Sequence, residues 1–326
     1  MSTSFKYNYK SIFGIYIEGL ILQKKSCGFI YDYESYMLKR FDDFCINRNY
    51  TNSVITREIV MDWAIQTDSE SINHRNQRVS FLRQLTLYMN SLGNNSYIPR
   101  RQSSQAITIP HIPDANELQE LFDVIDNYQP KLKGWHVYTM IYQVLFRLYY
   151  CCGLRLAEGC NLKNTDVNLE KGILTIKQSK GKKDRLVYMA DDLTALCKDY
   201  DVSISRIHAD RAYFFPGRKP GKPLCKTGID AKFKMFWEMT ACSKNCEKAP
   251  TVHALRHAFV VDRINQWMSE GISLDIMMPY LCRYLGHSGI KDTMYYYHQV
   301  RTAFQIVRER DTVSSQVIPE VIMHES

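Results

Sequence analysis

The chain has 326 residues, of which 45% are hydrophobic, and this is enough to fill the cores of two domains of ordinary size. Its apolar stretches are interrupted by polar residues before they reach the roughly 18 residues of a membrane span, and residues 1–10 lack the apolar block of a secretion signal. A net charge of +8 favours a polyanionic partner. We therefore expect a cytoplasmic protein that has no membrane partner.

The ten cysteines are scattered along the chain at irregular intervals. In the cytoplasm such cysteines are more often buried small hydrophobic residues than disulfide bridges. Cys242 and Cys246, with His253 seven residues further on, suggest part of a metal site, but a fourth ligand at a zinc-like spacing is missing. The sequence therefore predicts no metal site.

Residues 1–98 are predicted to form a helical domain. Aromatic and apolar residues recur at helical spacing over 31–45, and residues 56–63 begin with a threonine that is typical of a helix start. The clearest helix covers residues 73–92, and Gly93-Asn94-Asn95 is expected to end it. Its predicted core stripe consists of Val79, Leu82, Leu85, Met89 and Leu92.

Three arginines on this same helix, Arg75, Arg78 and Arg83, are candidate contacts to nucleic-acid phosphates. A solvated helix face is the other interpretation of the same residues. Residues 99–113 contain three prolines and show neither helical nor strand periodicity, so they are predicted to link two domains. The second domain, 114–310, is expected to open with a helix whose start is capped by Asp114 and Glu117.

A buried helix over residues 135–151 is expected to end at Gly153, which places Arg155 on the following turn or in the first turn of the next helix. Residues 172–177 and 184–189 have the pattern of two strands that flank a polar turn. That turn carries Lys180, Lys182 and Lys183, which suit a cationic contact to a substrate but are also common on any exposed turn. The rest of the chain, through residue 310, has the pattern of helices and loops.

This second domain holds the residues needed to break a phosphodiester bond without a metal. Such a reaction requires a nucleophile, cations for the non-bridging oxygens and an acid for the leaving oxygen. Arg155 and Arg256 suit the phosphate because a guanidinium is planar and remains charged, although a single arginine is more often part of a surface salt bridge. His253 lies three residues before Arg256, so both share one face if the segment is helical.

Tyr296 is the candidate nucleophile, since a phenoxide can attack phosphorus and conserve the bond energy in a phosphotyrosine. It lies nine residues after His287, in a run of three tyrosines, and tyrosine is usually a packing residue. Tyr295 and Tyr297 are the alternatives if the register differs by one residue. Lys180 is the candidate acid, because nearby cations lower the pKa of an amine.

Six residues in fixed order and context resemble the tyrosine recombinase (phage integrase) family. They are Arg155 in Gly153-Leu154-Arg155-Leu156-Ala157-Glu158, Lys180 in Ser179-Lys180-Gly181, His253 and Arg256 in His253-Ala254-Leu255-Arg256-His257, His287 in Leu285-Gly286-His287, and Tyr296. The resemblance runs from about residue 114 to about residue 301 and more loosely through the helical part before it. It implies a site-specific recombinase or integrase of a mobile element, which cuts and rejoins DNA through a 3′-phosphotyrosyl intermediate.

The resemblance also implies a role for each of these residues. Arg155 and Arg256 would bind the scissile phosphate, with Glu158 supporting Arg155, and Lys180 would be the general acid. His253 would assist proton transfer from Tyr296, and His287 would hydrogen-bond the phosphate. Ala157 stands where many members have serine, and residues 267–271 lengthen the segment between Arg256 and His287.

The fold that the resemblance implies is mainly α with a small antiparallel β-sheet, arranged as a two-domain DNA clamp. A helical core-binding domain (1–98) and a mixed α/β catalytic domain (114–310) would grip double-stranded DNA, without a cofactor, in association with the nucleoid. A homo-tetramer on two DNA sites, with accessory DNA-bending or directionality factors, is expected. The tail, 311–326, would be either exchanged between protomers or folded onto its own domain.

Two other functions remain open from the sequence. A type IB topoisomerase-like enzyme would use the same chemistry, although the helical first domain and the Leu-Gly-His context favour recombination. A catalytically silent DNA-binding or regulatory protein of the same fold is the alternative from another class. The intact set of candidate catalytic residues argues against the silent protein.

Overall fold

The computed structural model describes residues 5–101, 110–130, 136–177, 184–287, 289–290 and 293–294, with the side chains at 136 and 137 left out. The chain divides into two compact units, Met1–Thr108 and Ile109–Ser326, and the predicted linker 99–113 includes this boundary. The predicted fold class is confirmed, because the described residues are mainly helical with one three-stranded antiparallel sheet. None of the described helices is long and apolar enough to cross a membrane.

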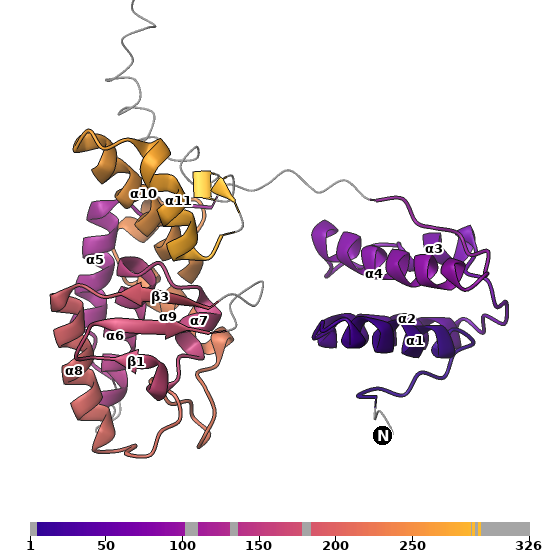
Figure 1. Cartoon of the computed structure of the whole chain (residues 1–326), viewed down its shortest axis with the longest axis horizontal. Coiled ribbons are helices and arrows are strands. Elements are labelled where there is room, and N and C mark those ends of the chain that lie inside the picture. The colour runs from indigo at the N-terminus through magenta and orange to yellow at the C-terminus, as the bar shows by residue number, and fades with distance from the viewer. Residues whose placement is uncertain are drawn as a thin grey trace, which may run out of the picture. The chain divides into compact units, whose positions relative to one another are not determined.

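The described part of the first unit is a bundle in which α4 packs against the three other helices (Figure 1). Thr56 and Ser71 cap α3 and α4 by accepting a hydrogen bond from the backbone N–H three residues later. Aromatic residues fill much of the core, with Phe41 packed edge-on against Trp63. The helices are α1 (Gly14–Ser26), α2 (Asp32–Asn47), α3 (Arg57–Trp63) and α4 (Ile72–Ser91).

The predicted stripe on α4 is confirmed at four of its five positions. Val79, Leu82, Leu85 and Met89 are all buried, but Leu92 is 59% exposed. The helix ends at Ser91, so Leu92 is the C-cap residue outside the helix, and the positive φ of Gly93 (+87°) then reverses the chain. The placement of Leu92 in the core was therefore wrong.

The described part of the second unit is built around α6, which packs against α5, α7, α8 and α10. Asp114 and Glu117 form the predicted capping box at the start of α5, with both hydrogen bonds at 2.9 Å. The helices are α5 (Ala115–Asp126), α6 (His136–Cys151), α7 (Leu156–Cys160), α8 (Asp191–Ser205), α9 (Lys226–Glu238), α10 (Val252–Ser269) and α11 (Leu274–Leu285), and two 3-10 turns cover Asn164–Asp166 and Cys242–Asn245.

The sheet contains β1 (Val167–Asn168), β2 (Ile173–Ile176) and β3 (Arg185–Tyr188) in the order β1-β2-β3. The two predicted strands are confirmed as β2 and β3, and they pair with Leu174 opposite Val187. The sheet lies on one side of the unit, and β3 contacts α11 (Figure 1). The end of α11 is thereby held beside β3 and α10.

Candidate active site

Three arginines from separate elements meet at the C-terminal end of α11. The last carbonyl groups of a helix have no partner within the helix, and this end of the helix dipole favours cations. Here three consecutive carbonyl oxygens each accept a hydrogen bond from a different guanidinium. The pairs are Arg185 Nε to Tyr284 O (2.7 Å), Arg256 Nη2 to Leu285 O (2.8 Å) and Arg155 Nη2 to Gly286 O (2.9 Å).

Gly286 ends α11 in the left-handed conformation, with φ +67°. A residue with a side chain adopts this conformation at a cost, whereas glycine does so freely. The turn at Gly286 directs its own carbonyl to Arg155 and places His287 beside Arg256. The Leu-Gly-His sequence is thus the turn that brings a histidine to the arginines.

Arg155 immediately precedes α7, as predicted, and Glu158 holds it in two ways. The Glu158 carboxylate accepts hydrogen bonds from the Arg155 backbone N–H (2.8 Å) and from its Nη1 (2.9 Å). The side chain of Glu158 is 7% exposed and that of Arg155 is 20% exposed. Arg155 is therefore partly open to solvent while its partner carboxylate is buried.

Arg185 was not singled out from the sequence, although it belongs to this cluster. Its two terminal nitrogens form a bidentate pair with Glu158 at 2.9 and 2.7 Å, and both side chains are 7% exposed. The available signal was the strand pattern: alternate residues of a strand share a face, so Arg185 faces the same way as the buried Val187. An arginine on the buried face of a strand requires a partner.

Arg256 lies in α10 and is 1% exposed. Besides Leu285 O, it donates to the Gly153 carbonyl and, from Nη2, to His287 Nε2 at 2.9 Å. Because a guanidinium only donates, Nε2 of His287 is the acceptor, and the neutral ring carries its proton on Nδ1. Nδ1 then donates to the hydroxyl of Thr293 at 2.7 Å. Thr293 is fully buried, and nothing in the sequence pattern pointed to it.

His253 and His257 lie one turn apart on α10, with their rings edge to face at 4.4 Å. His253 is exposed, yet loss of hydration around its ring and the charges of Arg256 and Arg155 lower its pKa to about 4. Burial, followed by the neighbouring His253 and Arg256, lowers the pKa of His257 to about 3. Both rings are therefore neutral near pH 7, and a neutral imidazole can accept a proton.

A hollow of about 470 Å³ adjoins Arg155 and Glu158. Its lining includes Lys163, Lys177 and Tyr213. Lys177 pairs with Asp166 at 2.5 Å and remains 55% exposed. Among the residues that the structure describes, no group of three or more His, Cys, Asp or Glu side chains is arranged to hold a metal.

The three arginines predicted on α4 differ in their surroundings. Arg78 is buried, forms a bidentate pair with Glu70 at 2.7 Å and lies over the ring of Trp63 at 4.7 Å. It also donates to the backbone carbonyls of residues 63 and 65. This arrangement assigns Arg78 to the interior of the first unit and corrects its interpretation as a phosphate contact.

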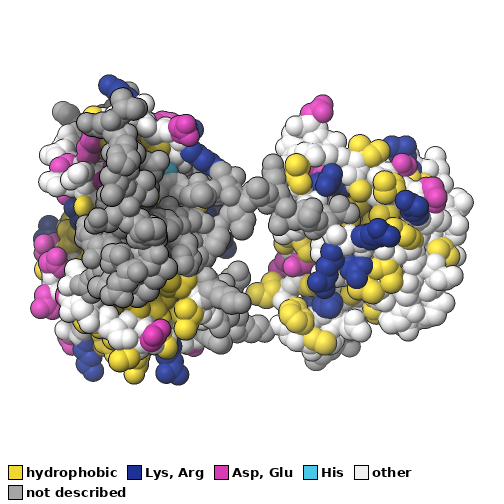
Figure 2. Space-filling model, turned by 90° about the horizontal axis from the view of Figure 1, so that it is seen from above, with side chains coloured by type: hydrophobic (Ala, Val, Ile, Leu, Met, Phe, Trp, Pro, Cys, Tyr) yellow, Lys and Arg dark blue, Asp and Glu magenta, His cyan; other side chains and the backbone are white. Residues whose placement is uncertain are grey.

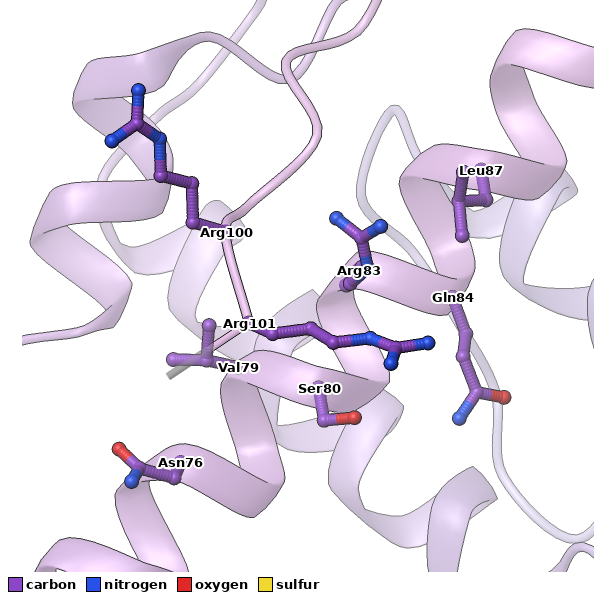
Figure 3. Close-up of a pocket in the computed structure, with 8 residues that line it drawn as sticks. All are labelled: Asn76, Val79, Ser80, Arg83, Gln84, Leu87, Arg100 and Arg101. Carbon is purple, nitrogen blue, oxygen red and sulfur yellow. The ribbon is translucent and has the colours of Figure 1, made fainter. Parts of the chain in front are cut away.

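Arg75 and Arg83 lie nearer the surface. Arg75 donates to the side chain of Asn76, and Arg83 donates to the Pro99 carbonyl. Arg83 also lines a hollow of about 400 Å³ with Arg100 and Arg101 (Figure 3). In this view the Arg101 side chain runs across α4 below Arg83 toward Gln84, whereas Arg100 points away. Lys and Arg side chains also gather on one face of this unit among hydrophobic ones (Figure 2).

Residues 114–302 match the Phage integrase family, and this span is more than half of the chain. The chain belongs to the phage integrase family. Among its relatives, the protein named "Putative integrase/recombinase y4rE" of Sinorhizobium fredii is 28% identical over 86% of this chain and 89% of its own length. Tyrosine recombinase XerA of Pyrococcus furiosus is 29% identical over 58% of this chain and 57% of its own length.

Solved structures of similar fold include two DNA complexes. The XerH site-specific recombinase, in a post-cleavage complex with a palindromic difH substrate, aligns with a TM-score of 0.61 and 18% identity over 86% of this chain and 79% of that one. The Lambda Integrase (residues 75–356) bound to DNA aligns with a TM-score of 0.58 and 15% identity over 92% of this chain and 98% of that one. At these identities the likeness concerns the fold.

In this member of the phage integrase family, the structure brings Arg155, Arg256 and His287 together, with Glu158 and His253 beside them. Arg185, Thr293 and His257 join the cluster without having been predicted. The remaining predicted residues, Lys180, Lys182, Lys183 and Tyr296, lie outside the described residues, as does the tail 311–326.

Proposed function

We propose that the protein is a site-specific DNA recombinase or integrase of a mobile genetic element, which cleaves and rejoins strands through a 3′-phosphotyrosyl intermediate. The observation that carries this proposal is the convergence of Arg155, Arg256 and His287 at the end of α11. Two guanidiniums at one place suit the non-bridging oxygens of a phosphodiester, and His287 orients one of them by accepting from Arg256 Nη2. The family match and the fold likeness to DNA-bound recombinases support the same reaction.

In the proposed mechanism the phenolic oxygen of Tyr296 attacks the phosphorus, and the bond from phosphorus to the 5′ oxygen breaks. The tyrosine proton passes to His253, whose lowered pKa leaves the ring neutral and able to receive it. Lys180 donates a proton to the departing 5′ oxygen. Arg155 and Arg256 bear the charge that develops on the phosphoryl oxygens. Rejoining reverses each transfer, so no external energy source is required.

We assign residues 1–98 to a core-binding domain, 99–113 to a linker and 114–310 to the catalytic domain, with the two domains clamped around double-stranded DNA. In this assignment the hollow beside Arg83 and Arg101 contacts the DNA backbone from the first domain, and Arg75 with Lys182 and Lys183 adds further contacts. A homo-tetramer on two DNA sites, with the tail 311–326 exchanged between protomers and accessory DNA-bending or directionality factors, completes the proposed assembly.

The decisive experiment traps the covalent intermediate. Nicked suicide duplexes from the junctions of the DNA element that carries the gene are incubated with wild type, Tyr295→Phe, Tyr296→Phe and Tyr297→Phe in EDTA. We expect a denaturation-stable adduct with wild type, its loss only in Tyr296→Phe, and a peptide map that places DNA on residue 296. Tight binding without any adduct would contradict strand cleavage and favour a silent DNA-binding protein.

The same proteins separate recombination from the topoisomerase-like alternative. A recombinase is expected to form the adduct on its own junction and to exchange strands between two such duplexes. Relaxation of supercoiled plasmids that lack the junction, as efficient as that of plasmids that contain it, would favour the topoisomerase. The salt dependence of binding does not discriminate, because all three functions include phosphate contacts.

A further inference from the structure

The Glu158 carboxylate receives four hydrogen bonds from two arginines. Arg155 supplies its backbone N–H to Oε2 and its Nη1 to Oε1, and Arg185 supplies Nη2 to Oε2 and Nη1 to Oε1. A carboxylate has about four lone-pair sites, so these contacts occupy all of them. Half of the acceptor capacity of Glu158 is therefore taken by Arg185.

This sharing determines how far Glu158 neutralises Arg155. One carboxylate between two guanidiniums leaves the group with a net charge of +1, whereas the carboxylate and Arg155 by themselves would sum to zero. With Arg185 on the carboxylate, the Arg155 guanidinium donates from Nη1 to Oε1 of Glu158. Without Arg185, two acceptor sites open, and Arg155 can turn into a bidentate pair with Glu158. That pair would compete directly with a bound phosphate.

Arg185 also anchors the chain that follows the β2–β3 connection. Its Nε donates to the Tyr284 carbonyl at the end of α11, so the first residue of β3 is tied to both α7 and α11. Lys177, just after β2, pairs with Asp166 on the other side of the same connection.

We propose, on the basis of the recombinase function above, that Arg185 is a positioning residue of the active site. By occupying Glu158 it leaves Arg155 able to bind the scissile phosphate, and by donating to Tyr284 O it fixes the start of β3 to the end of α11. Arg185 acts through Glu158 and α11, because all three of its guanidinium nitrogens are engaged and its side chain is 7% exposed.

The test measures single-turnover adduct formation on the suicide duplex at saturating DNA, with DNA affinity and thermal unfolding measured in parallel. Arg185→Gln is expected to slow adduct formation about 100-fold, as for a misplaced catalytic group, while DNA affinity changes less than about threefold. Arg185→Lys keeps the positive charge but loses the planar guanidinium that donates to both oxygens of Glu158, and it is expected to recover about one tenth of the wild-type rate.

The matched control is Arg147→Gln. Arg147 also forms a bidentate pair, with Asp126 at 2.9 and 2.6 Å, and joins α5 to α6 within the same unit. Within the described part of the chain, its hydrogen bonds and its ring contact involve residues of α5 and α6, away from the three arginines at the end of α11. We expect its adduct rate to stay within about twofold of wild type, since exposed ion pairs contribute little.

A double variant distinguishes positioning from a merely structural role. If Arg185 prevents Glu158 from neutralising Arg155, then the rate loss in Arg185→Gln requires the Glu158 carboxylate. The double variant Arg185→Gln/Glu158→Gln should therefore react faster than Arg185→Gln, at the same rate as Glu158→Gln. Rate losses that multiply in the double variant would overturn the inference, because independent effects are additive in free energy. If Arg185→Gln loses its cooperative unfolding transition, Arg185→Lys takes its place in the same comparison.

The reaction of wild type distinguishes failure of the recombinase function from failure of the positioning role of Arg185. Wild type that binds the junction duplex without forming an adduct overturns the recombinase function and the positioning role with it. Wild type that forms the adduct, together with an Arg185→Gln protein that reacts within about threefold of it, overturns the positioning role alone.

Discussion

Acidification is predicted to destabilise the second unit through His257. The His257 side chain is 4% exposed on α10, and burial beside His253 and Arg256 lowers its pKa from 6.5 to about 3. Between these two values the unfolded chain binds a proton that the folded chain does not. Stability is therefore fully present above about pH 6.5 and is lost as the pH falls toward 3.

The size of the loss at pH 5 follows from the unfolded pKa. At pH 5 the unfolded ring lies 1.5 pH units below its pKa of 6.5, and each unit corresponds to about 1.4 kcal/mol, so His257 contributes about 2 kcal/mol of destabilisation relative to pH 8. The folded ring is essentially unprotonated at pH 5 for any folded pKa below about 4. The destabilisation at pH 5 is therefore set by the pKa of the unfolded chain.

The assay is urea unfolding at pH 8 and pH 5 of protein labelled with fluorotryptophan and followed by fluorine NMR. Trp63 is buried in the first unit and Trp237 in the second, so the two transitions are observed separately. His257→Asn is expected to lose about 2 kcal/mol less than wild type between the two pH values in the Trp237 transition. His208→Asn, a histidine of the same unit that contacts Tyr138, is the control and should keep the wild-type difference. Equal pH dependence of wild type and His257→Asn would refute the reasoning.

Two further predictions concern the arginines of the first unit. Arg78→Met leaves the Glu70 carboxylate buried without its cation and should lower the free energy of unfolding of this unit by about 3–5 kcal/mol. Part of that loss should be recovered in Arg78→Met/Glu70→Leu. Unchanged stability together with weakened DNA binding would instead identify Arg78 as a phosphate contact. Arg83→Gln should reduce by about 1 the slope of log affinity for DNA against log salt. Lys25→Gln, at the exposed end of α1, is its control, and an equal reduction there would argue against a specific role for the hollow.

The parts of the fold that the sequence predicted are those specified by neighbouring residues. Asp114 and Glu117 cap a helix from three residues apart, and Gly93 ends one by its own conformation. The strands β2 and β3 likewise follow from alternation within each segment. Arg155 and Arg256 were found because each sits in a distinctive local context, and the structure places both at one site.

The features that the sequence did not predict depend on contacts between distant residues. The burial of Arg78 depends on Glu70, which reaches it from the turn before α4, and helical spacing carries no signal of that pairing. Thr293 contacts His287 only because α11 turns at Gly286. Arg185 is paired with Glu158 from another element, 27 residues away. Backbone carbonyls, which recruit three of the arginines, are present at every residue and so are invisible in a sequence pattern.

The carbonyl groups at the end of α11 determine where the protein tolerates insertions and deletions. The turn between α10 and α11 includes Gly271, where an added Cβ would have no atom within 4 Å. Residues gained or lost there change the length of an exposed turn and leave the end of α11 in place. One residue added inside α11 would instead rotate its last carbonyls by about 100° and direct them away from all three guanidiniums at once. Evolution can therefore vary the distance in sequence between Arg256 and His287, while the docked end of one helix keeps them hydrogen-bonded.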